Sequence, residues 1–154
     1  MIDPIFIFGA KYLFILSLFL TGFYFYQVPI ENRRRFIIFF LILLPTVYLA
    51  GMGARQLYDN PRPFVVGQFE PLIEHEADNG FPSDHVLLVG ALAAGFLYFN
   101  RRAAFWLWLV AILVAISRIY VGVHHLLDVG ASMVIAVACA IIIEKIYGNN
   151  KRIQ

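Results

Sequence analysis

The chain has 154 residues, of which 61% are hydrophobic and 14% are charged, with a formal net charge of +2. Soluble domains carry about 25% charged residues, so the composition excludes an ordinary soluble domain and predicts a membrane protein. The sequence lacks the basic stripe with interleaved aromatic residues that nucleic-acid binding requires, so we expect no nucleic-acid partner. A single cysteine, Cys139, excludes a disulfide framework within the chain and a cysteine-rich metal site.

A helix needs about 20 apolar residues to cross a bilayer. Five apolar runs come close to or exceed this length, which predicts one all-α domain over 1–154, a polytopic membrane helix bundle of about five transmembrane helices. The first run lacks the basic lead of a signal peptide, so we expect it to be retained as a helix. The five candidate spans are 5–27, 36–57 (with Pro45 inside), 84–99, 103–121 and 125–147.

Basic residues near the ends of the runs predict the orientation. With five spans, the positive-inside rule places these residues on the cytoplasmic side. The three motifs described next, all within 55–128, then lie on the opposite, outer side together with the polar connection 58–82. A polar connection of that length is usually functional or disordered. The orienting basic residues are Arg33, Arg34, Arg35, Arg101, Arg102, Lys145, Lys151 and Arg152.

The first motif covers 55–63 and contains two arginines. Arg55 lies near the outer end of the second span, and Arg62 follows after six residues. Pro61 and Pro63 interrupt the helix, so the chain can turn back and direct both guanidinium groups to one point. A guanidinium can bind two phosphate oxygens at once and keeps its charge at any relevant pH. The alternative is that both arginines only contact lipid headgroups.

The second motif covers 81–85, at the predicted start of the third span. Ser83 or Asp84 can cap the helix, and the backbone N–H groups of its first turn can bind an anion. His85 would then lie beside a bound phosphate and could donate a proton to a leaving oxygen. The alternative is simple capping together with a histidine at the membrane interface.

The third motif covers 117–128. His124 and Asp128 are four residues apart, so they share a face if a helix begins here. A carboxylate beside an imidazole fixes its tautomer and leaves the other ring nitrogen as a nucleophile. Arg118 adds a further cation for a phosphate. The alternative is that Asp128 only complements a helix N-terminus.

Two other histidines are interpreted as structural or solvated. His125 must point away from His124 on a helix, so we expect it at the interface. His75 lies between Glu74 and Glu76, and its spacing fits no metal-ligand pattern, so we expect a solvated loop. We expect Ser17 and Ser132, within apolar runs, to serve helix packing.

In this order the motifs resemble those of the type-2 phosphatidic acid phosphatase family of membrane enzymes. The third motif matches the family's Ser-Arg, five residues, His, three residues, Asp in full, and Asp84 stands where the family has Gly. Two segments, ADNGFPSDH from Ala77 and SRIYVGVHH from Ser117, are similar to the sequence of the bacitracin-resistance type of undecaprenyl-diphosphate phosphatase. Combined motifs of this kind are far more specific than any single one.

The resemblance implies hydrolysis of undecaprenyl diphosphate through a phosphohistidine, with no metal or cofactor, on the outer side of a bacterial plasma membrane. It implies His124 as the nucleophile, Asp128 as its orienting carboxylate and His85 as the acid for the leaving group. Arg55, Arg62, Ser83 and Arg118 would bind the phosphoryl oxygens.

Two alternatives remain open at the level of sequence. The motifs recognise a phosphate and not the lipid tail, so the substrate could instead be phosphatidylglycerophosphate, phosphatidic acid or lipid A. A non-enzymatic alternative is a lipid transporter or channel subunit whose arginines select headgroups. The sequence leaves the oligomeric state undetermined.

Overall fold

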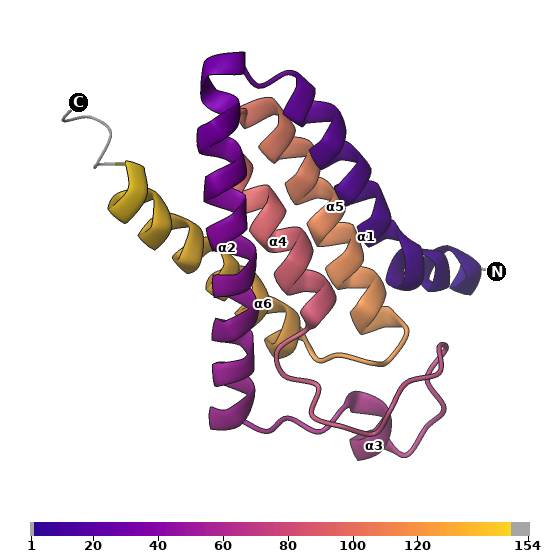
Figure 1. The fold of residues 1–154 in the computed structure, drawn as a ribbon. Helices are drawn as coiled ribbons and strands as arrows, with labels where there is room; N and C mark the ends of the chain where they lie inside the picture. Colours follow the sequence, from indigo (N-terminus) through magenta and orange to yellow (C-terminus); the bar gives the residue numbers. More distant parts are fainter. Residues whose placement is uncertain (1, 149–154) are drawn as a thin grey trace.

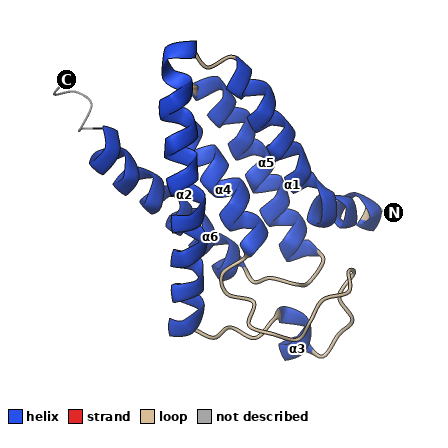
Figure 2. Ribbon diagram, in the orientation of Figure 1, coloured by secondary structure: helices blue, strands red, loops and turns tan. Residues whose placement is uncertain are grey.

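The computed structural model describes residues 2–148, and in this part of the chain Figures 1 and 2 show only helices and the loops that join them. Four helical segments are long and apolar enough to cross a membrane: α1, α2, α5, and α6 with its π-helical extension. The expectation of an all-α membrane helix bundle is therefore confirmed. The helices are α1 (Asp3–Tyr26), α2 (Ile30–Leu57), α3 (Pro63–Gly67), α4 (Asp84–Phe96), α5 (Arg101–Tyr120) and α6 (Leu126–Ile143), followed by the π-helix η1 (Glu144–Gly148).

Two helices begin earlier than their apolar runs. α2 begins at Ile30, so the arginines 33–35 lie inside the helix and not in the connection before it. Arg33 donates to the carbonyls of Tyr26 and Val28 at 2.9 and 3.2 Å, where α1 has ended. Arginine forms helices well, and hydropathy detects only the apolar part of a helix.

The other described basic residues used to predict the orientation also lie inside helical elements and not in the connections between them. Arg101 and Arg102 open α5, because the side chain of Asn100 caps this helix by accepting from Ala103 N at 3.1 Å. Lys145 lies in η1. Lys151 and Arg152 lie outside the described residues.

α4 is the central helix and the shortest of the apolar helices. Its 13 residues span about 20 Å, less than the hydrocarbon core of about 30 Å. It packs against α5, α6 and α2, and almost all of it from Val86 onward is buried. Figure 1 shows that α4 begins some way above the lower end of α2. Gly80, Pro82 and Ser83 directly before α4 are buried, so this irregular backbone is covered by protein, which is where a membrane protein tolerates it.

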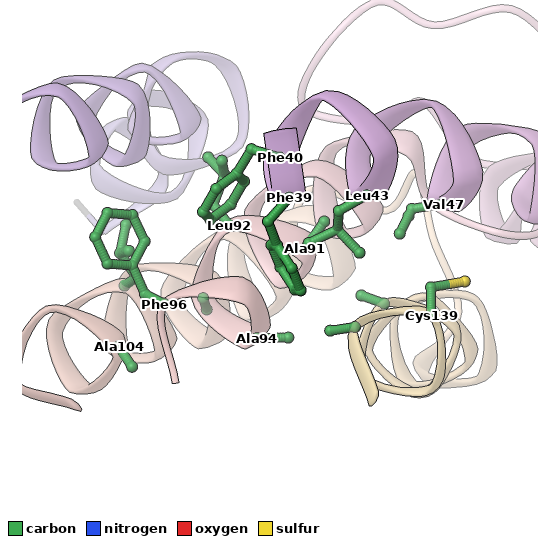
Figure 3. Packing of buried hydrophobic residues seen from close by; sticks show 14 of the residues in the cluster. Phe39, Phe40, Leu43, Val47, Ala91, Leu92, Ala94, Phe96, Ala104 and Cys139 are labelled. Atoms are coloured by element: carbon green, nitrogen blue, oxygen red, sulfur yellow. The ribbon is translucent and has the colours of Figure 1, made fainter. Parts of the chain in front are cut away.

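Aromatic rings of α2 fill the space beside α4. Phe39 of α2 and Phe96 of α4 are fully buried, and the ring of Phe40 lies 5.6 Å from that of Phe96. Figure 3 shows these rings between α2, α4 and α5, with Ala91 and Ala94 on α4 allowing close approach. Packing of this kind fixes the positions of the helix ends.

The three motifs lie at one end of the bundle. α2 ends, α4 begins, α5 ends and α6 begins at this end, which is the lower end in Figure 1, near α3 and the long loop. The alternating direction of the helices therefore brings together residues that are far apart in the sequence.

A matched pair of glycines on α1 tests its contact with α5. A Cβ atom on Gly9 would clash with the hydroxyl of Ser117 and lie 3.0 Å from its Cβ, whereas a Cβ on Gly22 would meet nothing within 4 Å. We expect Gly9→Ala to lower stability by about 1–3 kcal/mol because the helices must separate. Gly22→Ala should be neutral or stabilising, since alanine favours a helix by up to about 1 kcal/mol. Thermal unfolding of both variants in detergent measures the difference, and equal unfolding temperatures would contradict it.

Candidate active site

A polar cavity of about 140 Å³ lies at the end of the bundle where the motifs meet. This volume holds about five waters at ~30 Å³ each, enough for a phosphoryl group. Five of the seven residues predicted from the sequence line it, and the other two, Ser83 and Asp128, are fully buried next to lining residues. The lining residues are Arg55, Arg62, His75, Asp78, Pro82, Asp84, His85, Arg118 and His124.

His124 lies just before α6 with one ring nitrogen directed toward the cavity arginines. Its Nδ1 is 2.9 Å from the carbonyl oxygen of Gly80 and 3.4 Å from Asp128 Oδ2. Both neighbours are acceptors, so Nδ1 carries the proton and donates to Gly80, while Nε2 keeps its lone pair. Nε2 lies 3.4 Å from a terminal nitrogen of Arg62 and 3.2 Å from one of Arg118.

The surroundings of His124 favour its neutral form. Burial, followed by the charges of Arg118 and Arg62, lowers the pKa of His124, and the hydrogen bond to Asp128 only partly opposes this. At neutral pH the imidazole is therefore uncharged, and its free lone pair is available for a nucleophilic attack.

Asp128 is held in place from two directions. Its Oδ2 accepts from the backbone N–H of His125 at 2.7 Å, and its Oδ1 accepts from the side-chain amide of Asn60 at 2.7 Å. Asp128 thus closes the first turn of α6, and the same carboxylate lies beside Nδ1 of His124. The position of Asp128 is compatible with both interpretations of the third motif, and its role as the orienting partner of His124 stays a prediction.

Arg62 and Arg118 approach His124 from different elements. Arg62 precedes α3, and its side chain donates to the carbonyl of Val123 at 2.9 Å and to Asp78 at 2.7 Å. Arg118 lies in the last turn of α5, and both arginines are about 5% exposed or less. Buried guanidinium groups need anionic or polar partners. Both arginines have such partners in the protein and also line the cavity.

Arg55 lies at the rim of the cavity. α2 ends at Leu57, so the predicted break before Pro61 is present, and Arg55 and Arg62 line one cavity from either side of it. Arg55 donates to Asp84 at 2.8 Å, and it is 35% exposed. The carboxylate of Asp84 is therefore neutralised by an arginine, which explains how an acid is tolerated beside the cavity.

The start of α4 differs from the expectation in one respect. Ser83 occupies the N-cap position, but neither Ser83 nor Asp84 makes a side-chain capping hydrogen bond. The hydroxyl of Ser83 and the Nε of Arg118 are buried and have no hydrogen-bond partner. A polar ligand in the cavity would satisfy donors of this kind. His85, in the first turn, lines the cavity, and its ring packs edge-on against Phe14 at 5.1 Å.

The sequence did not single out two asparagines that hold the motifs together. The side-chain oxygen of Asn79 accepts from the backbone of Asn60 and Phe81 at 3.0 and 2.8 Å. Its amide nitrogen donates to the carbonyls of Arg55 and Tyr58 at 3.3 and 3.0 Å. One amide therefore joins the end of α2, the first motif and the second motif. The only hint of this role in the sequence was that Asn79 lies within the segment ADNGFPSDH.

Two residues of the long loop also reach the cavity. We expected His75 to lie in a solvated loop. Its Nε2 instead lies 3.1 Å from a terminal nitrogen of Arg118, so the expectation is wrong about where the side chain lies. Asp78 binds Arg62; burial alone would raise its pKa, but the hydrogen bond and charge of Arg62 hold the pKa below its usual range.

The remaining expectations concern serines, His125 and metals. Ser132 Oγ donates to the carbonyls of Asp128 and Ser83 at 2.7 and 3.1 Å, so it packs α6 against the start of α4. Ser17 bonds within α1 to Phe14. His125 points away from the cavity to the carbonyl of Pro61 at 3.1 Å. Within residues 2–148, no group of three or more His, Cys, Asp or Glu is placed to hold a metal ion.

The fold and the cavity define a helical membrane protein with an arginine-lined polar cavity at one end of the bundle. Residues 35–152 match the PAP2 superfamily, and the chain belongs to it. This bears out the resemblance drawn from the three motifs.

Named relatives and solved structures agree with this family. The bacitracin transport permease protein BcrC of Bacillus licheniformis is 34% identical over 93% of this chain and 70% of its own length. The undecaprenyl-diphosphatase BcrC of Bacillus subtilis is 41% identical, over 53% of this chain and 42% of its own length. Among structures, LpxE of Aquifex aeolicus has a TM-score of 0.69 at 25% identity, covering 94% of this chain and 86% of its own. A PAP2-type phosphatidylglycerolphosphate phosphatase of Bacillus subtilis has a TM-score of 0.61 at 21% identity, covering 98% and 75%, and shares the fold.

Proposed function

We propose that this protein is a membrane phosphatase that removes the terminal phosphate of a polyprenyl diphosphate, converting undecaprenyl diphosphate to undecaprenyl phosphate. One observation carries the proposal. The Nδ1 of His124 contacts Gly80 and Asp128, which leaves the lone pair on Nε2 facing Arg62 and Arg118. The name of the Bacillus subtilis relative, undecaprenyl-diphosphatase BcrC, supports the choice of substrate.

In the first step His124 Nε2 attacks the terminal phosphorus. An N–P bond forms, and the bond from phosphorus to the bridging oxygen breaks. The imidazole gains positive charge, which Asp128 offsets beside Nδ1. Arg62 and Arg118 stabilise the negative charge on the phosphoryl oxygens, which is most of what phosphoryl transfer requires of a protein.

The leaving group needs a proton, and the second step needs a base. His85 lines the cavity, takes up a proton together with the anionic substrate and passes it to the departing lipid phosphate. In its neutral form it then accepts a proton from water, which attacks the phosphohistidine and breaks the N–P bond. Inorganic phosphate leaves, and both histidines return to their starting states. The unpaired hydroxyl of Ser83 donates to a phosphoryl oxygen, and Arg55 at the rim faces the second phosphate.

An apolar groove of about 260 Å³ next to the cavity supports a lipid substrate. Leu44, Val47 and Tyr48 of α2 form one wall, and Leu87, Leu88 and Ala91 of α4 form the other. Asp84 lines both the groove and the cavity, so the two lie next to each other at this residue. A lipid tail can lie between α2 and α4 while its phosphates reach the arginines.

We further propose a bacterial plasma membrane location with the cavity on the outer side. The motifs lie at one end of the bundle, and the arginines at the start of α2 and α5 lie at the other end, as Figure 1 shows for these helix starts. The positive-inside rule then places the cavity outside.

The direct test is phosphate release by purified protein in detergent. We expect release from undecaprenyl and farnesyl diphosphate in the presence of a chelator, with kcat/KM above that for phosphatidylglycerophosphate and phosphatidic acid. A higher kcat/KM for a monophosphate would reassign the substrate. Transport or binding of the lipid without phosphate release would instead favour a transporter.

The pH dependence of kcat/KM provides a second prediction. The pKa of His124 is lowered, mainly by burial, so the nucleophile remains neutral down to below its ordinary value of about 6.5. Activity should therefore persist as the pH falls through about 6.5 and decline only at lower pH. A profile of kcat/KM with a saturable substrate measures this. A decline that is complete above that pH would show that His124 is not the group that must be deprotonated.

A further inference from the structure

His75 belongs to the long loop between α3 and α4, and its ring faces the cavity. Its Nε2 lies 3.1 Å from a terminal nitrogen of Arg118, and its ring centroid lies 6.3 Å from that of His124. The same nitrogen of Arg118 lies 3.2 Å from His124 Nε2. One guanidinium NH₂ group therefore stands between two imidazoles.

The loop that carries His75 is held firmly against the bundle. Leu72 N donates to the carbonyl of Val121 at 3.0 Å, and the neighbouring Ile73 is only 5% exposed. Phe69 packs on Gly122, whose φ of +83° and lack of a Cβ leave room for the ring. Val121 and Gly122 lie between Arg118 and His124 in the third motif, so these contacts hold His75 at the cavity wall.

We propose that His75 is a phosphate-binding residue that takes up a proton when the phosphoryl group binds and donates a hydrogen bond to it from Nε2. This assignment rests on the proposed function of the cavity. A phosphoryl group attached to His124 Nε2 places an oxygen beside the terminal nitrogen of Arg118. That position is within reach of His75 Nε2, because the same nitrogen of Arg118 contacts both rings. A lone pair on Nε2 would repel this oxygen, whereas an N–H would bind it.

The charges around His75 make the proton uptake depend on the ligand. Arg118 on α5, Arg62 before α3, and the two other cavity histidines face His75, and Asp78 is the opposing carboxylate. In the free protein, burial and then the two arginines lower the pKa of His75, so it is neutral and accepts from Arg118. A bound phosphate raises the pKa of His75, because its negative charge opposes the effect of the two arginines at close range.

The experiment is calorimetric titration of the full-length protein with inorganic phosphate, in buffers of different ionisation enthalpy. His75→Gln is the test variant, since the glutamine oxygen can accept from Arg118 but cannot be protonated. Glu74→Gln, in the same loop and exposed, is the control. The protonation of phosphate itself, and that of His85 and His124, is common to all three proteins, so differences in proton uptake isolate His75.

We expect His75→Gln to bind phosphate about tenfold more weakly at about pH 6, with a smaller difference at about pH 8. The variant should also take up fewer protons on binding than the parent protein, and Glu74→Gln should match the parent protein. Equal affinity, or a uniform loss with unchanged proton uptake, would overturn the assignment and leave His75 a packing residue. Absence of phosphate binding by the parent protein would also overturn it.

The proposed function can fail separately. If no lipid releases phosphate but the titrations behave as expected, His75 still binds an anion in this cavity and only the reaction is wrong.

Discussion

Replacing His124 with alanine is expected to lower kcat on the lipid diphosphate by at least about 10⁴-fold, because the variant has no nitrogen at the position of the nucleophile. The arginines and Ser83 should still bind the phosphate groups of the substrate, so the loss should appear in kcat more than in KM. Acid quenching with a substrate labelled in the terminal phosphate should trap an acid-labile phosphoprotein in the parent protein and none in the variant.

The neighbouring histidine supplies a matched control. His125→Ala removes an imidazole that bonds to the carbonyl of Pro61, but it keeps the backbone N–H that Asp128 accepts. We expect its kcat within a few-fold of the parent protein. Full turnover by His124→Ala, or equal losses in both variants, would refute a nucleophile at His124.

Asp128→Asn is expected to lower kcat by about 10³-fold with little change in KM. The amide keeps the shape of the carboxylate and can still accept from the backbone of His125, so α6 should remain capped. It lacks the negative charge that offsets the imidazole as the N–P bond forms. The phosphohistidine should therefore form slowly, which rapid quenching of a single turnover measures.

Asp59→Asn is the control for this charge change, since Asp59 is exposed in the connection after α2. It should retain full activity and the same unfolding temperature. A loss of kcat in Asp128→Asn that follows a fall in unfolding temperature would indicate that Asp128 acts only in stability, which contradicts the prediction.

Much of the bundle could be predicted because apolar length is a local property of the chain. The runs 5–27 and 125–147 correspond closely to α1 and to α6 with η1. The starts of α2 and α5 could not be placed, because arginine residues continue a helix beyond its apolar part. α4 illustrates a different limit: its 13 residues are too short to span alone, and only burial among its neighbours accounts for them.

The candidate site was predictable where spacing carries the chemistry. His124 and Asp128 are four residues apart at the start of α6, so their closeness in the chain brings them together although His124 lies just before the helix. Arg55, Arg62 and Arg118 were grouped by residue type and by the predicted side of the membrane. Asn60, Asn79 and His75 could not be found in this way, since their partners are 19 to 68 residues away in the sequence.

The sequence by itself determined the environment of this protein and the kinds of groups in its site, because hydropathy and residue chemistry belong to each segment separately. The tertiary structure alone decided which nitrogen of His124 keeps its lone pair, since the other nitrogen donates a hydrogen bond to the carbonyl of Gly80. It also decided that Asp84 is paired with Arg55 and that His75 faces the cavity. These are contacts between distant segments, and they exist only once helix packing has set the distances between the helix ends.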